Sequence, residues 1–188
     1  PLAFEKGKGV TLFASDGTPY LDFNSGLGVN ALGHCHTAVA TLIHAQAEKV
    51  YHTSNLYHIP AQSDLAGKLC AKSFGERVFF CNSGAEAVEG ALKFARKRGT
   101  DIEPAKTGVI AFNNSFHGRT FGALSATMQE KYRKGFEPLL PDFHEAVFND
   151  IDSVKNAMDE TTAAVIIEPL QGEGGVNPAD AAFMRELE

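Results

Sequence analysis

The stretch "VFFCNSGAEAVEGALKFARKRG", Val78 to Gly99, decides the fold. It lies across the junction of an apolar segment, Arg77 to Cys81, which we expect to be extended, and a helical pattern from Ala85 to Arg98 whose apolar residues share one face. Ser83 and Glu86 have the S-x-x-E spacing of a capping box, in which each side chain satisfies a backbone N–H of the first helical turn. The sequence therefore predicts a strand that leads directly into a helix.

The chain repeats this alternation of helix and strand from about Pro60 onward. Besides the elements above, it predicts a helix from Asp64 to Ser73 and extended segments at Val109 to Phe112 and Ala163 to Ile167. Such alternation indicates an α/β fold with a mostly parallel sheet covered by helices on both faces. In these folds ligands bind beyond the carboxyl ends of the strands, so the three loops that follow the strands are the places to search for a site.

The segment before Pro60 follows a different pattern. Apolar residues alternate around Asp16-Gly17, which predicts a hairpin, and a helix is expected from Thr37 to about Val50. We therefore expect residues 1–59 and 60–188 to belong to different domains. The chain starts with Pro1 and ends in a helical pattern without a stop signal, so we also expect it to be a fragment of a longer protein.

Composition excludes several classes of partner. The 188 residues are 44% hydrophobic and 21% charged, which is enough apolar material for a packed core, and the formal net charge is -6. A negative balance argues against nucleic acids and anionic membranes, and no apolar run is long enough to span a membrane. The three cysteines are odd in number and form no C-x-x-C pair, which favours a reducing, cytoplasmic setting.

The first loop predicts an anion site. Gly84 and Ala85 offer backbone N–H groups with little side-chain bulk at a helix start, where the helix dipole favours negative charge. The spacing is neither of the two common glycine motifs for triphosphates and dinucleotides, so a monophosphate on a compact cofactor is the better candidate. A purely structural joint is the alternative. We expect the helix to end at Gly99. Four basic residues precede this glycine, and we interpret them as structural because their charge suits the negative end of a helix; they are Lys93, Arg96, Lys97 and Arg98.

The second and third loops contain a ring, a cation and two carboxylates. Phe116 and His117 follow the second strand; Phe116 could stack on a flat ring, and Arg119 suits a carboxylate. Packing and a surface ion pair are the alternatives for these two residues. In the third loop we expect Glu168 to bond loop backbone, whereas Glu173 lies among glycines and is the better candidate for a site.

The "GHCH" segment predicts no metal site. His34 and His36 would share a face only in an extended conformation, Cys35 would then point away, and no second ligand pair is near them in the sequence. We therefore expect no metal site in this chain.

Taken together, five segments resemble those of the class III aminotransferases, pyridoxal-phosphate enzymes of fold type I, and in particular the acetylornithine aminotransferase branch. The segments occur in the family's order and cover nearly the whole chain: "YLDFNSGLGVNALGHCH", "HTSNLYHIPAQSDLA", "VFFCNSGAEA", "SFHGRTFGALSATMQEKYRKGF" and "AAVIIEPLQGEGGVNPA". The resemblance implies that residues 60–188 form part of the large cofactor-binding domain and residues 1–59 the start of the small domain.

The resemblance also implies roles for the loop residues. Ser83, Gly84 and Ala85 would bind the phosphate of pyridoxal 5'-phosphate and Phe116 would stack on its ring. Arg119 would bind the substrate's α-carboxylate, and Glu173 would lie on the substrate side, where it can pair with a basic residue.

One departure from the family concerns catalysis. The family's Schiff-base lysine and the aspartate that binds the pyridine nitrogen match no residue in this chain, and Lys131 and Lys134 correspond to positions outside the catalytic role. We therefore assign no catalytic residue and expect the chain by itself to be inactive.

For the intact protein the resemblance implies transamination between N-acetylornithine and 2-oxoglutarate in a homodimer. Aminotransferases for succinylornithine, ornithine and 4-aminobutyrate are the alternatives within the family. From a different class, a non-catalytic phosphate- or cofactor-binding module and a nucleotide-binding domain remain open.

Overall fold

The computed structural model describes residues 2–188, and these residues form two compact units. Within these residues the first unit ends at Val78 and the second is Phe79–Glu188. Each is described by itself below, and the domain boundary expected between residues 59 and 60 stays a prediction. Within the described residues, no helix combines the length and the apolar character needed to cross a membrane.

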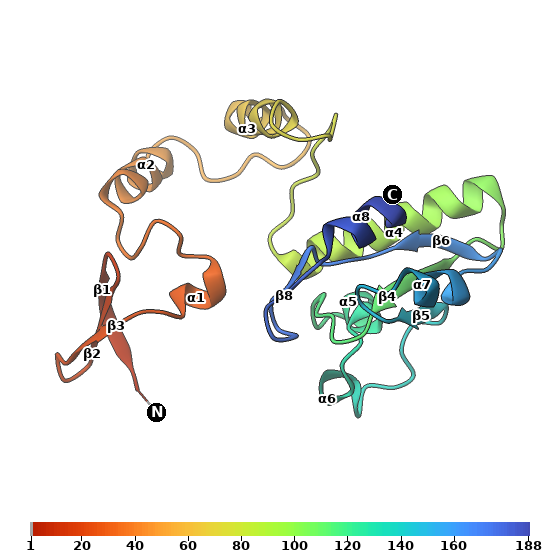
Figure 1. Ribbon diagram of the computed structural model, residues 1–188. Helices are drawn as coiled ribbons and strands as arrows, with labels where there is room; N and C mark the ends of the chain where they lie inside the picture. Colours follow the sequence, from red (N-terminus) through yellow and green to blue (C-terminus); the bar gives the residue numbers. More distant parts are fainter. Residues whose placement is uncertain (1) are drawn as a thin grey trace. The chain divides into compact units, whose positions relative to one another are not determined.

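The first unit contains an antiparallel sheet and three separate helices (Figure 1). The sheet order is β1-β2-β3, and the hairpin predicted around Asp16-Gly17 is confirmed as the β2–β3 connection. Gly17 has φ +85°, which few other residues adopt at low cost. The bounds are β1 Phe4–Lys8, β2 Thr11–Ala14, β3 Pro19–Leu21, α1 Ser25–Gly28, α2 Thr37–Ala47 and α3 Pro60–Cys70.

The two longer helices of this unit differ from the sequence prediction at their ends. α2 begins at Thr37 as predicted and ends at Ala47 instead of about Val50. α3 begins at Pro60, four residues earlier than predicted, because proline has no N–H that the first turn must satisfy and its φ already suits a helix.

The second unit is built on a three-stranded parallel sheet. β4, Gly108–Phe112, lies between β5, Phe143–Ala146, and β6, Thr162–Val165. All five residues of β4 are buried, as expected for a central parallel strand. The predicted α/β fold with a parallel sheet is therefore confirmed, whereas β5 was missed because "FHEA" has no strong apolar pattern.

Helices cover both faces of this sheet, as predicted. On one face the side chains of Ile110 and Phe112 pack with Val154 of α7 and Phe183 of α8. On the other face Ala111 packs with Ala126 of α5, and α4 contacts β6 and α5. The remaining bounds are α4 Gly84–Ile102, α5 Phe121–Ala126, α6 Glu130–Arg133, α7 Ile151–Ala157, β7 Leu170–Gln171, β8 Asn177–Pro178 and α8 Ala181–Leu187.

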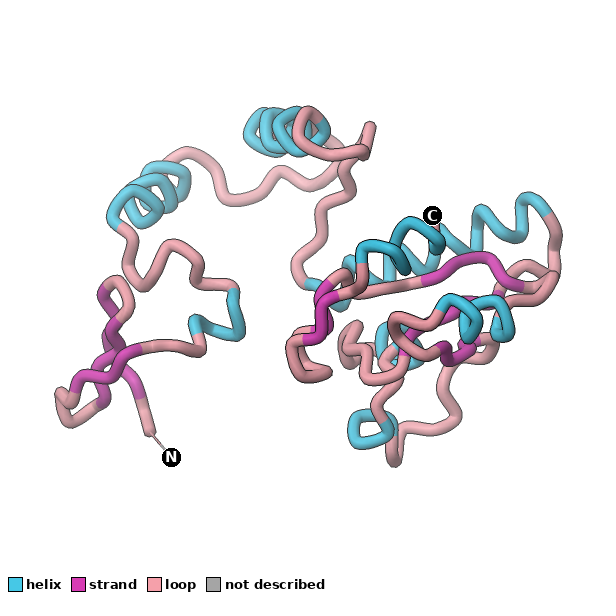
Figure 2. Tube along the Cα trace, in the orientation of Figure 1, coloured by secondary structure: helices cyan, strands magenta, loops and turns pink. Residues whose placement is uncertain are grey.

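Two predictions about the deciding stretch were wrong. The segment predicted as a strand, Arg77–Cys81, lies in the loop between α3 and α4 (Figure 2), because no neighbouring strand is present for it among residues 2–188. Gly99 does not end α4, which continues to Ile102. A Cβ at Gly99 would collide with the carbonyl oxygen of Lys106 and lie 2.9 Å from the Cβ of Ala163, so this glycine allows close packing of α4.

Candidate active site

The start of α4 is capped from two directions. The Oγ of Ser83 accepts a hydrogen bond from the N–H of Glu86 at 3.2 Å, which confirms one half of the predicted capping box. The Glu86 carboxylate instead accepts from the backbone N–H of Asn82, at 2.6 Å, and from its side-chain amide, at 2.9 Å. The acidic partner therefore reaches one residue further back than predicted and holds the loop before the helix.

The backbone N–H groups of the first two residues of α4, Gly84 and Ala85, are available to a ligand. Gly84 is exposed and Ala85 is half-buried, and within the described residues neither N–H has an acceptor. α4 is 19 residues long, so its N-terminus carries a substantial positive partial charge. This geometry suits an anion such as a phosphate group.

The second loop packs directly on this helix start. A Cβ at Gly118 would lie 3.0 Å from the Cβ of Ala85 and 2.9 Å from the Cβ of Ala123, and its φ is +131°. Only glycine combines that backbone conformation with this close approach. The structure thus brings the first and second loops together, which the sequence alone did not specify.

Phe116 is held by its backbone rather than by its ring. Its N–H donates to the Glu168 carboxylate at 2.8 Å, which confirms the expectation that Glu168 bonds loop backbone. The half-buried Phe116 ring makes an edge contact with Tyr132, with centroids 5.3 Å apart. Tyr132 was missed from the sequence because it lies in the polar segment "EKYRK", which has no apolar periodicity.

The guanidinium of Arg119 lies over the same aromatic pair. Its Cζ is 5.2 Å from the centroid of the Tyr132 ring and 6.0 Å from that of Phe116. Arg119 is exposed and forms no ion pair with any residue that the structure describes. It borders a cavity of about 330 Å³ that is lined by Arg119, Phe121, Leu124, Lys131, Tyr132 and Phe136. A small carboxylate could therefore reach this cation.

The third loop is fixed against the second, but its carboxylate points to no described partner. The amide of Gln171 donates to the carbonyl of Asn113 at 2.8 Å, and a Cβ at Gly174 would lie 2.7 Å from the carbonyl oxygen of Asn114. Glu173 itself is exposed in the turn between β7 and β8. The structure places its backbone beside the second loop, and its role on the substrate side stays a prediction.

His117 is buried and has an unpaired ring nitrogen. Only 8% of the residue is exposed, and Nε2 has no hydrogen-bond partner within residues 2–188. Burial lowers the pKa of His117 to about 4, so the ring is uncharged at neutral pH. Buried polar atoms rarely lack a partner, and this one belongs to the segment that carries Phe116 and Arg119.

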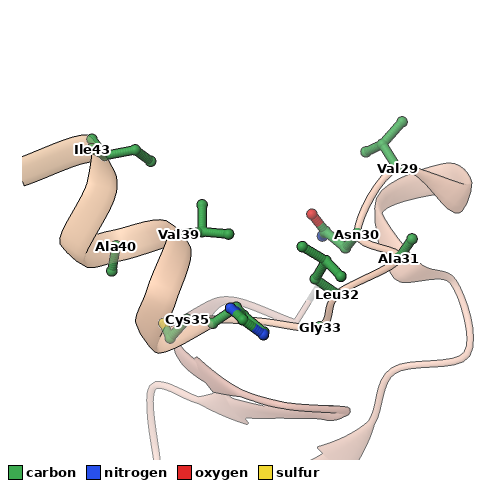
Figure 3. Close-up of a pocket in the computed structure, with 10 residues that line it drawn as sticks. Val29, Asn30, Ala31, Leu32, Gly33, Cys35, Val39, Ala40 and Ile43 are labelled. Atoms are coloured by element: carbon green, nitrogen blue, oxygen red, sulfur yellow. The ribbon is translucent and has the colours of Figure 1, made fainter. Parts of the chain in front are cut away.

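Other parts of the described chain offer weaker candidates. A cavity of about 390 Å³ in the first unit is lined mainly by apolar residues of α2 and the preceding loop, including Val39 and Leu32 (Figure 3). None of the predicted site residues borders it. Residues 2–188 contain no group of three or more His, Cys, Asp or Glu side chains that could hold a metal ion.

The whole chain, residues 1–188, matches the family described as Aminotransferase class-III. It belongs to this family. Acetylornithine aminotransferases from Aquifex aeolicus and Methanocaldococcus jannaschii are 52% and 48% identical in alignments that include the whole of this chain. These alignments cover 50% and 47% of the lengths of the two relatives. A crystal structure of ornithine aminotransferase from Toxoplasma gondii, described with partial occupancy of PLP at its active site, is 32% identical. It superposes with a TM-score of 0.93 over all of this chain and 45% of that one.

These likenesses confirm the predicted family and fold type I. This chain spans about half the length of the curated relatives it matches. The roles of its individual site residues stay predictions, because no ligand defines them.

Proposed function

We propose that the complete protein is a pyridoxal-phosphate-dependent aminotransferase that transfers the terminal amino group of N-acetylornithine to 2-oxoglutarate. The products would be N-acetylglutamate semialdehyde and glutamate, which is a step of arginine biosynthesis. One observation carries the proposal: Gly118 packs on Ala85. This contact places the loop with the Phe116 ring and the Arg119 guanidinium against a helix start with free N–H groups. The similarity to acetylornithine aminotransferases supports the choice of donor.

The first two loops fit pyridoxal phosphate. The N–H groups of Gly84 and Ala85 suit its phosphate, and the Ser83 hydroxyl, which accepts from Glu86, keeps its own proton free to donate. The backbone of Phe116 is fixed by Glu168, and its half-buried ring would stack on the flat ring of the cofactor. When bound, the cofactor supplies the carbonyl group that takes up the amino group and a ring that withdraws electrons.

Arg119 would bind the α-carboxylate of the amino donor. A guanidinium can hold a carboxylate through two parallel hydrogen bonds, which fixes the direction in which the substrate points. Among the described residues this guanidinium lies over two aromatic rings and forms no ion pair, so no protein carboxylate has to be displaced first. Glu173 would contribute from the third loop, where its exposed carboxylate can pair with a basic group.

Ornithine is the strongest alternative donor, because a structure described as an ornithine aminotransferase superposes with a TM-score of 0.93. The test is a set of initial rates for the complete gene product with pyridoxal phosphate and 2-oxoglutarate. The amino donors would be N-acetylornithine, N-succinylornithine, ornithine and 4-aminobutyrate. We expect the highest kcat/KM for N-acetylornithine. A preference for unacetylated ornithine would contradict the proposed substrate, and cofactor binding without turnover of any donor would favour a non-catalytic module.

We also propose that the complete protein is a homodimer. This proposal is based on the family resemblance. Four large apolar side chains of the first unit are more than 80% exposed in the described chain, and either the rest of the protein or a second subunit would cover them; they are Phe23, Tyr51, Leu56 and Phe74. Sedimentation velocity at several protein concentrations tests this proposal. A monomer at every concentration would contradict it.

A further inference from the structure

Glu89, on the second turn of α4, makes an unusual set of contacts with a distant loop. Its Oε1 accepts hydrogen bonds from the backbone N–H groups of Gly122, at 2.9 Å, and Ala123, at 3.1 Å, and from the hydroxyl of Thr120. A Cβ at Gly122 would collide with the same carboxylate. The approach of this side chain to the first turn of α5 therefore depends on a residue without a side chain.

These contacts place Arg119 between two anchors on one helix. Gly118, which precedes Arg119, packs on Ala85 in the first turn of α4, and Thr120, which follows it, bonds to Glu89. Residues 85 and 89 are one turn apart, or about 6 Å along the helix axis. Arg119 itself is exposed and without an ion pair among residues 2–188, so its backbone neighbours determine where the guanidinium can reach.

We propose that Glu89 is a positioning residue for the substrate carboxylate. It fixes the backbone of Arg119 relative to the phosphate seat at the start of the same helix, and it touches neither ligand. This inference rests on the proposed role of Arg119. Without the second anchor the loop is held to α4 mainly at Gly118, and the guanidinium moves relative to the reacting end of the substrate. Misplacement of a binding group by about 1 Å can cost roughly a hundredfold in rate.

The test compares two amines that differ in one group. N-Acetylputrescine has the chain of N-acetylornithine without its carboxylate, so only N-acetylornithine uses Arg119. In the complete gene product loaded with pyridoxal phosphate, we expect Glu89→Ala to lower kcat/KM for N-acetylornithine relative to N-acetylputrescine by about tenfold or more, mainly through KM. Glu89→Gln should lose less, because its amide oxygen still accepts a hydrogen bond. The affinity for the cofactor, measured by absorbance titration, should remain unchanged.

Two further variants separate positioning from a loss of stability. The hydroxyl of Ser125 in α5 donates to the carbonyl of Phe121 at 2.7 Å and accepts from the N–H of Leu140 at 3.0 Å, so Ser125→Ala weakens α5 without touching Thr120. We expect this control to leave the ratio of the two amines unchanged. Arg119→Ala should abolish the preference for the carboxylate, and adding Glu89→Ala to it should then have no further effect on the ratio.

A binding measurement makes the inference independent of the donor. Glutarate carries two carboxylates but no reacting group, and we expect its Kd, measured by calorimetry, to rise about tenfold in Glu89→Ala. If N-acetylornithine is not a substrate but Glu89→Ala still weakens glutarate binding, the proposed donor is wrong and the inference stands. If N-acetylornithine is turned over while Glu89→Ala and Glu89→Gln change neither the amine ratio nor the glutarate Kd, the inference is overturned. Equal losses for both amines would overturn it as well.

Discussion

The two interior glycines of α4 should respond with opposite signs to the same substitution. An alanine normally stabilises a helix interior by about 1 kcal/mol relative to glycine. At Gly90 a Cβ would lie 3.4 Å from a ring carbon of Phe79, an ordinary contact, so we expect Gly90→Ala to stabilise by about 0.5–1 kcal/mol. At Gly99 it would collide with the carbonyl oxygen of Lys106, which belongs to the backbone and cannot rotate away. Overpacking of this kind costs about 1–3 kcal/mol, so Gly99→Ala should destabilise by about 1–2 kcal/mol.

Urea unfolding of the complete protein measures both effects. If the transition is two-state with an unchanged slope, the midpoints of the two variants should lie on opposite sides of the wild-type midpoint. The expected gap between the variants is about 1.5–3 kcal/mol, which is above the error of such a comparison. If Gly99→Ala raised the midpoint as much as Gly90→Ala, the close contact of α4 with the segment before β4 would be refuted, because the added methyl group would then have room.

Three other perturbations follow from single contacts. Ser83→Ala should destabilise α4 by about 1 kcal/mol and weaken pyridoxal phosphate binding in equilibrium dialysis, whereas Ser83→Thr, which keeps the hydroxyl, should do neither to the same extent. The pKa of His117 is lowered to about 4, below its ordinary value of 6.5, so the unfolded chain is protonated first on acidification. The free energy of unfolding should therefore fall by a few kcal/mol between pH 6.5 and 4. Urea unfolding at a series of pH values measures this fall, and it should be smaller in His117→Asn. Arg96 donates to the carbonyls of Thr107 and Pro141, so Arg96→Lys should cost about 1–2 kcal/mol; no loss would contradict a structural role.

The sequence predicted the elements that local rules determine. The cap at Ser83 and the fully apolar strand around Ile110 depend on residues close together in the chain, and both were found where they were expected. The strand expected at Arg77–Cys81 depends on a partner strand elsewhere, and no apolar pattern can show whether that partner is present. The predicted ends of helices were less accurate for a similar reason. Glycine has a low helix propensity, which predicted a helix end at Gly99, but the contacts of Gly99 show that it lies within α4 and allows close packing there.

The candidate site was predictable only in its separate parts. Gly84 and Phe116 were named from the character of their loops, but the contact that joins these loops, between Gly118 and Ala85, spans 33 residues of chain. Glu89 was not named, because a glutamate within a helix usually faces solvent. The groups that donate hydrogen bonds to it lie more than 30 residues away, and only the tertiary structure shows that it joins the two loops.

The carboxylates and the unpaired groups of the second unit fall into different sets. Glu86, Glu89 and Glu168 all accept backbone N–H groups, so their charge holds loops in place. Within the described residues, the N–H of Gly84, the guanidinium of Arg119 and the Nε2 of His117 lack hydrogen-bond or ion-pair partners. Leaving a buried polar group such as this imidazole unpaired costs about 1–3 kcal/mol, so its retention beside well-satisfied loops needs a reason. A polar group of a bound ligand that formed a hydrogen bond with Nε2 would be such a reason, and this argument is independent of any likeness to other proteins.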